Sequence, residues 1–213
     1  SVLTVFEANQ PPRTFNLGSF GKGCIYFGRD PRSDIVLSSP MVSSEHGRFS
    51  YRNGFWVIED KAVYKGQPST NGIIYNNQRV NMRCVFDGDF IRIDDKNSGV
   101  SSGVLFVFSA ADASNRWTSI SLANNPKLTI GRDSRCKLVL PHVSISKLHA
   151  VITLERDGYY INDNNSTNGV IVNNRRIRGR VKLNEKDVIV ISNTKLIFTS
   201  KEVYYCSYSN GIS

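Results

Sequence analysis

The sequence predicts an all-β protein made of two β-sandwiches in tandem, and three observations lead to this expectation. Short apolar runs of strand length alternate with clusters of Gly, Asn and Asp, which favour turns. No window shows a sustained apolar period of 3.6 residues with capping residues at its ends, so we expect helices to be absent or minor. Three short motifs recur in the same order in both halves, which indicates an internal duplication.

The repeat consists of a Gly-Arg-Asp motif, a Ser-x-x-His motif and a Ser-Thr-Asn-Gly motif. The first two, at residues 28–30 and 43–46, recur 103 positions later, and the third, at residues 69–72, recurs 97 positions later. The first copy therefore holds six extra residues before its third motif, and residues 62–68 are interpreted as an enlarged loop. The predicted organisation is a first domain at 1–110, a short polar linker at 111–115, a second domain at 116–200 and a C-terminal tail leading to a further region at 201–213.

Pairs of short runs predict β-hairpins in each half. Residues 47–60 are expected to form two strands around Arg52-Asn53-Gly54, since Asn-Gly supplies the positive φ angles of a two-residue turn. Their counterpart, residues 150–162, turns at Arg156-Asp157-Gly158. Two further strand pairs complete the pattern: 90–93 with 104–108, and 188–191 with 195–198. Many short strands punctuated by turns are typical of two packed sheets.

The composition is that of a folded protein with an excess of positive charge. Apolar residues make up 40% of the 213 residues and charged residues 21%, and no run is long enough to span a membrane or direct secretion. The net charge of +9 favours an anionic partner; the chain up to Ala110 has 12 basic and 10 acidic residues, and the remainder has 15 and 8. The four cysteines lack metal-ligand spacing, so we interpret them as free thiols of a reducing cytoplasm and expect no metal or cofactor.

The ordered set of motifs resembles the forkhead-associated (FHA) domain. In both halves, Gly-Arg is followed fourteen residues after the Arg by Ser-x-x-His, then by Ser-Thr-Asn-Gly, and then by Gly-Asp or Lys-Asp before an apolar strand. The resemblance covers roughly residues 2–108 and 116–200. It implies a Greek-key-like sandwich of about eleven strands in each half, with loops at one end that hold a phosphothreonine.

The family pattern implies one set of binding residues in each half. Arg29 and Arg132 correspond to the charged phosphate ligand, and a planar guanidinium suits this role because it binds phosphate through two parallel donors. The remaining implied ligands are Ser43, Ser44 and Thr70 in the first half and Ser146, Lys147 and Thr167 in the second. Asn71 and Asn168 would hold the backbone of the peptide, Gly28 and Gly131 would let the backbone turn, and His46 and His149 would brace the loops.

One departure from the family pattern distinguishes the two halves. The family usually has Arg or Asn after the motif serine, where the first half has Ser44 and the second has Lys147. A charge-assisted hydrogen bond contributes roughly 1.5 to 3 kcal/mol, so the loss of such a donor weakens a site about tenfold or more. We therefore predict that the second domain is the stronger binder.

The run Arg175–Arg180 is the densest cluster of charge. We interpret it as a solvated hairpin edge that discourages aggregation. The alternative is a second anion site for acidic peptide flanks, lipid headgroups or nucleic acid.

The sequence as a whole predicts a non-catalytic, cytoplasmic reader of phosphothreonine in a partner protein, dependent on a Ser/Thr kinase. The alternatives are a degenerate FHA scaffold for phosphate-independent contacts and a basic binder of nucleic acid or anionic surfaces. Specific nucleic-acid binding is not expected because no aromatic residues lie within the basic run, and no nucleophile and base pair indicates an enzyme. The tandem also resembles the N-terminal regulatory region of larger bacterial proteins, including ABC transporters, where it would lie on the cytoplasmic face of the membrane.

Overall fold

The computed structural model describes residues 1–94, 103–109 and 117–207. The chain folds as two units, Ser1–Ser114 and Asn115–Ser213. The linker expected at 111–115 lies outside the described residues. Each unit is an all-β sandwich of two sheets, as the sequence predicts, with eleven strands among its described residues.

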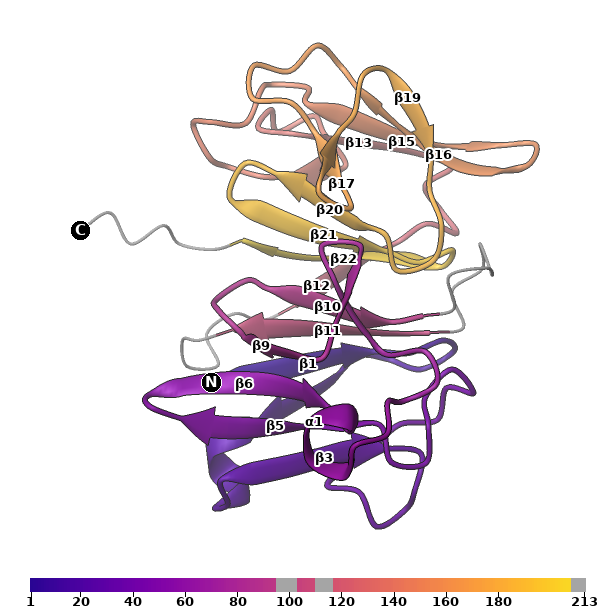
Figure 1. Cartoon of the computed structure of the whole chain (residues 1–213). Coiled ribbons are helices and arrows are strands. Elements are labelled where there is room, and N and C mark those ends of the chain that lie inside the picture. Colours follow the sequence, from indigo (N-terminus) through magenta and orange to yellow (C-terminus); the bar gives the residue numbers. More distant parts are fainter. Residues whose placement is uncertain (95–102, 110–116, 208–213) are drawn as a thin grey trace. The chain divides into compact units, whose positions relative to one another are not determined.

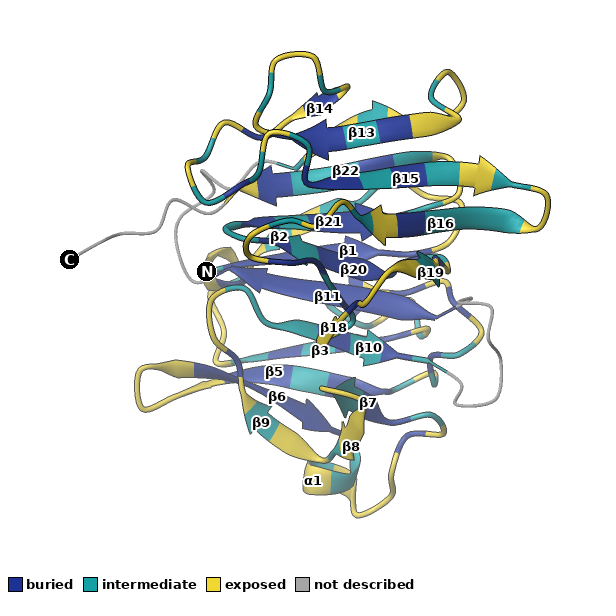
Figure 2. Ribbon diagram, turned by 90° about the horizontal axis from the view of Figure 1, so that it is seen from above, coloured by how far each residue is buried: buried dark blue, intermediate teal, exposed yellow. Residues whose placement is uncertain are grey.

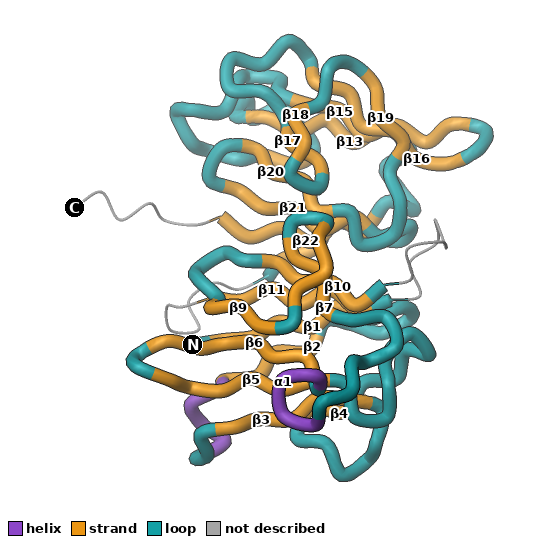
Figure 3. Tube along the Cα trace, in the orientation of Figure 1, coloured by secondary structure: helices purple, strands orange, loops and turns teal. Residues whose placement is uncertain are grey.

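The first unit contains strands β1 to β11 (Figure 1). They are β1 (Val2–Phe6), β2 (Arg13–Asn16), β3 (Cys24–Gly28), β4 (Ile35–Val36), β5 (Gly47–Arg52), β6 (Phe55–Asp60), β7 (Ile73–Tyr75), β8 (Gln78–Val80), β9 (Met82–Cys84), β10 (Phe90–Ile93) and β11 (Val104–Ser109). One sheet has the order β2-β1-β11-β10-β7-β8 and the other β4-β3-β5-β6-β9. The helical content described here is a 3-10 turn at Leu17–Phe20 and the single-turn α1 (Ala62–Lys65), which lies in the loop expected to be enlarged (Figure 3).

Three phenylalanines join the two sheets of the first unit. Phe27 and Phe49 come from β3 and β5, and Phe106 comes from β11 in the opposite sheet. Their ring centroids lie 5.3 to 5.9 Å apart with tilted or edge-on geometry, and all three side chains are buried. The buried strand β11 is uniformly dark in Figure 2, while the turn between β5 and β6 is exposed. The apolar residues of β3, β5 and β11 therefore build one core between the two sheets.

The second unit contains strands β12 to β22. They are β12 (Thr118–Ser121), β13 (Lys127–Gly131), β14 (Leu138–Val139), β15 (Ala150–Glu155), β16 (Gly158–Asp163), β17 (Ile171–Val172), β18 (Arg175–Arg176), β19 (Arg180–Lys182), β20 (Val188–Ile191), β21 (Thr194–Phe198) and β22 (Glu202–Ser207). The sheets have the orders β12-β22-β21-β20-β17-β18 and β14-β13-β15-β16-β19. The core is mainly aliphatic, with Ile152, Ile161 and Leu196 fully buried.

The expected hairpins form in both units. Strands β5 and β6 pair around Asn53 and Gly54, whose φ angles of 51° and 85° are the left-handed values that a two-residue turn requires. Strands β15 and β16 also pair, but at this turn the positive φ is that of Gly158, at 137°. The pairs β10 with β11 and β20 with β21 are confirmed as well.

The C-terminal boundary of the second domain differs from the expectation. The sequence predicts a tail from residue 201, but Glu202–Ser207 form strand β22, which pairs on one side with β12 and on the other with β21. Its Val203 and Cys206 are buried, which explains why this segment joins the fold. In the first unit the same position in the sheet, between β2 and β11, belongs to the N-terminal strand β1. The second unit thus fills an interior place in its sheet with its last strand.

Candidate functional site

In each unit, the loop that follows strand β3 or β13 is joined to the loop that carries the motif serine. The backbone N–H groups of Arg29 and Asp30 donate to the carbonyl oxygens of Ser43 and Ser44 at 3.0 and 2.9 Å. In the second unit, Arg132 and Asp133 make the same bonds to the carbonyls of Ser146 and Lys147, both at 3.0 Å. The duplicated motifs therefore occupy equivalent positions in the two units.

The motif glycines allow this close approach of the backbone. A Cβ atom at Gly28 would lie 2.1 Å from the carbonyl oxygen of Ser44, and one at Gly131 would lie 2.2 Å from that of Lys147. The sequence predicts that these glycines let the backbone turn, but neither has a positive φ. The requirement is steric contact with the neighbouring loop rather than an unusual backbone conformation.

Each motif arginine is fixed by one bond that leaves its outer face exposed. Nε of Arg29 donates to the carbonyl of Val42 at 2.6 Å, and Nε of Arg132 donates to that of Ile145 at 3.0 Å. Both arginines are exposed, and neither forms an ion pair with any residue in the described ranges. These bonds use Nε alone, and the terminal nitrogens of a guanidinium suit bidentate contact with an oxyanion.

The carboxylates that follow these arginines are held by other cations. Arg32 pairs with Asp30 at 2.6 Å, and Arg135 pairs with Asp133 at 2.9 Å. The hydrogen bond from Arg32 lowers the pKa of Asp30 to about 2, and the bond from Arg135 likewise holds the pKa of Asp133 well below its usual range. Each carboxylate is therefore ionised and bound to its own partner instead of to the motif arginine.

The motif serine connects its loop to the loop of the Ser-Thr-Asn-Gly motif. Oγ of Ser43 accepts from the backbone N–H of Thr70 at 3.2 Å and lies 3.4 Å from the Thr70 hydroxyl. Oγ of Ser146 accepts from the N–H of Thr167 at the same distance of 3.2 Å. The hydroxyl-bearing residues of the two loops are thereby joined next to the loop of the motif arginine.

A buried histidine links the same two loops from beneath. Nδ1 of His46 accepts from the N–H of Ser43 at 3.0 Å, and its Nε2 lies 3.1 Å from the carbonyl of Gly72, to which it donates. His149 is related in the same way to Ser146 and Gly169, at 3.0 and 3.1 Å. Burial lowers the pKa of His46, so this ring stays neutral at pH 7, with Nε2 protonated.

The motif asparagines are oriented by backbone carbonyls. Nδ2 of Asn71 donates to Met41 at 2.8 Å, and Nδ2 of Asn168 donates to Ser144 at 2.7 Å. With the amide nitrogen fixed, the side-chain oxygen is positioned to accept from an external N–H, such as that of a peptide backbone.

The two sites differ at the residue that follows the motif serine. Ser44 and Lys147 are both exposed, and both use their carbonyls to bind the preceding loop. The ammonium of Lys147 forms no ion pair within the described part of the chain. The second site therefore presents an exposed cation, Lys147, where the first site has the neutral Ser44.

Sequence reasoning missed the backbone acceptors that orient these side chains. These acceptors are the carbonyls of Met41, Val42, Ser144 and Ile145. No sequence signal marks them, because every residue carries a carbonyl. It also missed a polar cluster beside the second site, where the Ser144 hydroxyl bonds Nδ1 of His142 at 2.6 Å and the hydroxyl of Ser192.

Other kinds of site have no support in the described ranges. No group of three His, Cys, Asp or Glu side chains there could hold a metal ion, and the four cysteines are free. No helix among these residues is long and apolar enough to cross a membrane.

In each of the two β-sandwiches an exposed arginine lies beside hydroxyl-bearing loops, an arrangement that suits an oxyanion. The chain belongs to the FHA domain family, since the model of the FHA domain matches residues 25–94 and 128–192. FHA domains are non-catalytic modules that bind phosphothreonine peptides, so the chain is a tandem module of this kind.

Curated relatives match one part of the chain each. The transcriptional regulatory protein EmbR of Mycobacterium tuberculosis is 42% identical over 69 residues, covering 32% of this chain and 18% of EmbR. The ABC transporter ATP-binding/permease protein Rv1747 of the same species is 38% identical over 93 residues, covering 43% of this chain and 9% of the transporter. The chain thus spans less than a fifth of the length of these relatives.

Solved structures of the same proteins are also similar. The FHA-1 domain of M. tuberculosis Rv1747 is 27% identical, with a TM-score of 0.37, and the match covers 51% of this chain and 96% of that domain. M. tuberculosis EmbR, in complex with a low-affinity phosphopeptide, is 30% identical, with a TM-score of 0.33, covering 45% of this chain and 26% of EmbR.

Proposed function

We propose that Arg29 and Arg132 each bind the phosphate of a phosphothreonine, assisted by the hydroxyl and amide groups of the two adjacent loops. The observation that carries this proposal is the same in both units: a guanidinium anchored through Nε, without a carboxylate partner in the described structure, beside Ser43 and Thr70 or their counterparts. A phosphothreonine brings a charge of about −1.5 to −2 and three acceptor oxygens, which this arrangement complements. Asn71 and Asn168 would then accept from the peptide backbone.

The proposed cellular role is phosphorylation-dependent binding of a partner protein in the cytoplasm, as a regulatory part of a longer protein. The partial coverage of EmbR and of the transporter Rv1747 supports a regulatory module within a larger chain. A Ser/Thr kinase would create the ligand. Two sites on one chain would allow bivalent capture of a doubly phosphorylated partner, with an effective concentration of about millimolar if the geometry permits.

Titration calorimetry with a phosphothreonine peptide library and matched unphosphorylated peptides tests the proposal. We expect Arg29→Ala and Arg132→Ala to weaken phosphopeptide binding at their own sites by about ten- to hundredfold, the value of one charge-assisted contact. Arg156→Ala is the control, because Arg156 is exposed and lies at the far end of strand β15 from His149. If the double variant still binds, or if phosphorylation makes no difference, the chain uses its loops for phosphate-independent contacts and the proposal fails.

We also propose that the second site binds more tightly than the first. The exposed Lys147 supports this, because it adds a second cation where the first site has the neutral Ser44. A reciprocal exchange tests it: Ser44→Lys is expected to strengthen the first site, and Lys147→Ser to weaken the second, each by about tenfold. Unchanged affinities in both variants would show that Lys147 does not contribute to phosphopeptide binding.

A further inference from the structure

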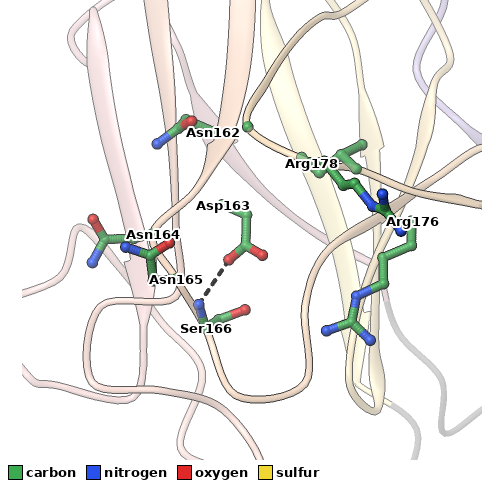
Figure 4. A pocket seen from close by; sticks show the side chains of 9 residues that line it. Asn162, Asp163, Asn164, Asn165, Ser166, Arg176 and Arg178 are labelled. Carbon is green, nitrogen blue, oxygen red and sulfur yellow. Dashed lines mark hydrogen bonds between the residues drawn. The ribbon is translucent and has the colours of Figure 1, made fainter.

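A polar pocket lies directly beside the proposed phosphate site of the second unit (Figure 4). It is lined by residues 162–166 at the end of β16 and by residues 176–179 between β18 and β19. Ser166, at its edge, immediately precedes Thr167 and Asn168 of the phosphate-binding loop. A peptide held by those two residues would need to extend by only a few residues to reach the pocket, because an extended chain advances about 3.3 Å per residue.

The pocket occurs where the two units differ in loop length. In the first unit, eight residues separate Asp60 from Ser69 and include helix α1. In the second unit, only Asn164 and Asn165 separate Asp163 from Ser166. This short loop is closed by a bond of 3.0 Å from the Ser166 N–H to Oδ1 of Asp163, drawn as the dashed line in Figure 4. In the first unit the longer loop folds back over β3 and β5, where Tyr64 of α1 packs against Tyr26 and Arg48.

The lining is chemically suited to an anion. Arg176 and Arg178 both line the pocket and are exposed, and neither forms an ion pair with a described residue. The neighbouring Arg180 is different, since its guanidinium binds both carboxylate oxygens of Glu155 at 2.6 and 2.8 Å. The acidic residue of the lining is Asp163, so the lining holds one carboxylate and two guanidinium groups.

The first unit provides an internal comparison for this basic run. At the offset of 97 positions that relates the third motifs, Arg176 corresponds to Arg79, Arg178 to Asn81 and Arg175 to Gln78. Arg178 is therefore the arginine of the lining that the first unit lacks. The run does form an exposed sheet edge, since Arg175–Arg176 are the edge strand β18, and Arg178 in addition lines the pocket.

We infer that this pocket is an acidic subsite of the second domain, in which Arg178 and Arg176 bind an anionic side chain of the phosphopeptide a few residues from its phosphothreonine. The inference rests on the proposed function of the second site. The anionic group is a carboxylate of Asp or Glu, or a second phosphate; both offer coplanar or clustered oxygens that a guanidinium binds through two donors.

Titration calorimetry on the full chain carrying Arg29→Ala, which leaves the second site as the reader, tests the inference. The ligands are phosphothreonine peptides of one sequence in which a flanking residue is neutral, acidic or phosphorylated, on either side of the phosphothreonine. We expect one of these positions to give a gain in affinity of about three- to tenfold for an acidic flank, and more for a phosphorylated one. Arg178→Asn, which installs the residue of the first unit, is expected to abolish that gain without changing the affinity for the neutral peptide.

Arg175→Gln is the matched control, since it also installs the first-unit residue and removes one charge, but outside the pocket lining. The gain is expected to persist in this variant. If phosphopeptides bind but an acidic flank adds nothing, or if the gain survives Arg178→Asn, the subsite is refuted while the phosphate site stands. An equal loss in both variants would indicate a general effect of net charge and also refute the subsite. If no peptide binds better when phosphorylated, both proposals fall.

Discussion

The buried His149 offers the sharpest test of how the binding loops are held. Replacing it with Ala removes the acceptor of the Ser146 N–H and the donor to the Gly169 carbonyl, at 3.0 and 3.1 Å, from a position with 0% exposure. A backbone group that loses its buried partner costs about 1 to 3 kcal/mol, and the cavity adds to this cost. We therefore expect His149→Ala to lower the free energy of unfolding of the second unit by about 3 to 5 kcal/mol.

Differential scanning calorimetry of the full chain measures this effect. For a domain of about 100 residues, each 1 kcal/mol corresponds to roughly 4 to 8 °C, so the transition of the second unit should fall by at least about 12 °C. His142→Ala is the control: this half-buried ring bonds only within the Ser144 loop, and we expect a change below about 1 kcal/mol. An unchanged transition temperature of the second unit in His149→Ala would refute bracing.

Three further predictions follow from burial and packing. Because burial lowers the pKa of His46, the unfolded protein takes up a proton on this residue at a higher pH than the folded protein does. The stability of the first unit is therefore expected to be full above about pH 6.5 and to fall as the pH drops below it. Urea unfolding of a His46→Gln variant should show a weaker dependence of stability on pH. Val203→Asp places an unpaired charge inside the sheet of the second unit and should unfold it, as hydrogen exchange would show, while Ser207→Asp, at an exposed position of the same strand, should be tolerated. Gly131→Ala should cost about 1 to 3 kcal/mol in thermal unfolding because its Cβ would lie 2.2 Å from a backbone oxygen, whereas Gly23→Ala, with open space around it, should be nearly neutral.

Most of the fold could be predicted from local patterns in the sequence. The hairpin at Asn53 and Gly54 could be predicted because the turn depends on two adjacent residues and their φ angles. Strand β22 could not, because its pairing with β12 joins segments about eighty residues apart, and no local pattern reports such a contact. Its short run of apolar and aromatic residues, Val203–Cys206, was the available signal.

The candidate site was predictable to the extent that it is duplicated. Arg29 and Arg132 could be identified because their motifs recur in order, although the bonds that fix them end on carbonyls that no sequence pattern distinguishes. The role of Gly131 required the distance to the next loop, which spacing alone does not give. The pocket near Arg178 is formed by two separate segments, 162–166 and 176–179, and their approach became visible only in three dimensions.

The placement of β22 also bears on how the protein is made. As the ribosome extends the chain, the first sandwich has all its strands once β11 has emerged, and it can close while the second half is still being translated. The second sandwich has to wait for its last strand, because the interior gap between β12 and β21 is filled by nothing made earlier in that unit. The second reader is therefore the later of the two to become competent, and a ribosome stalled before residue 202 would present the first reader alone.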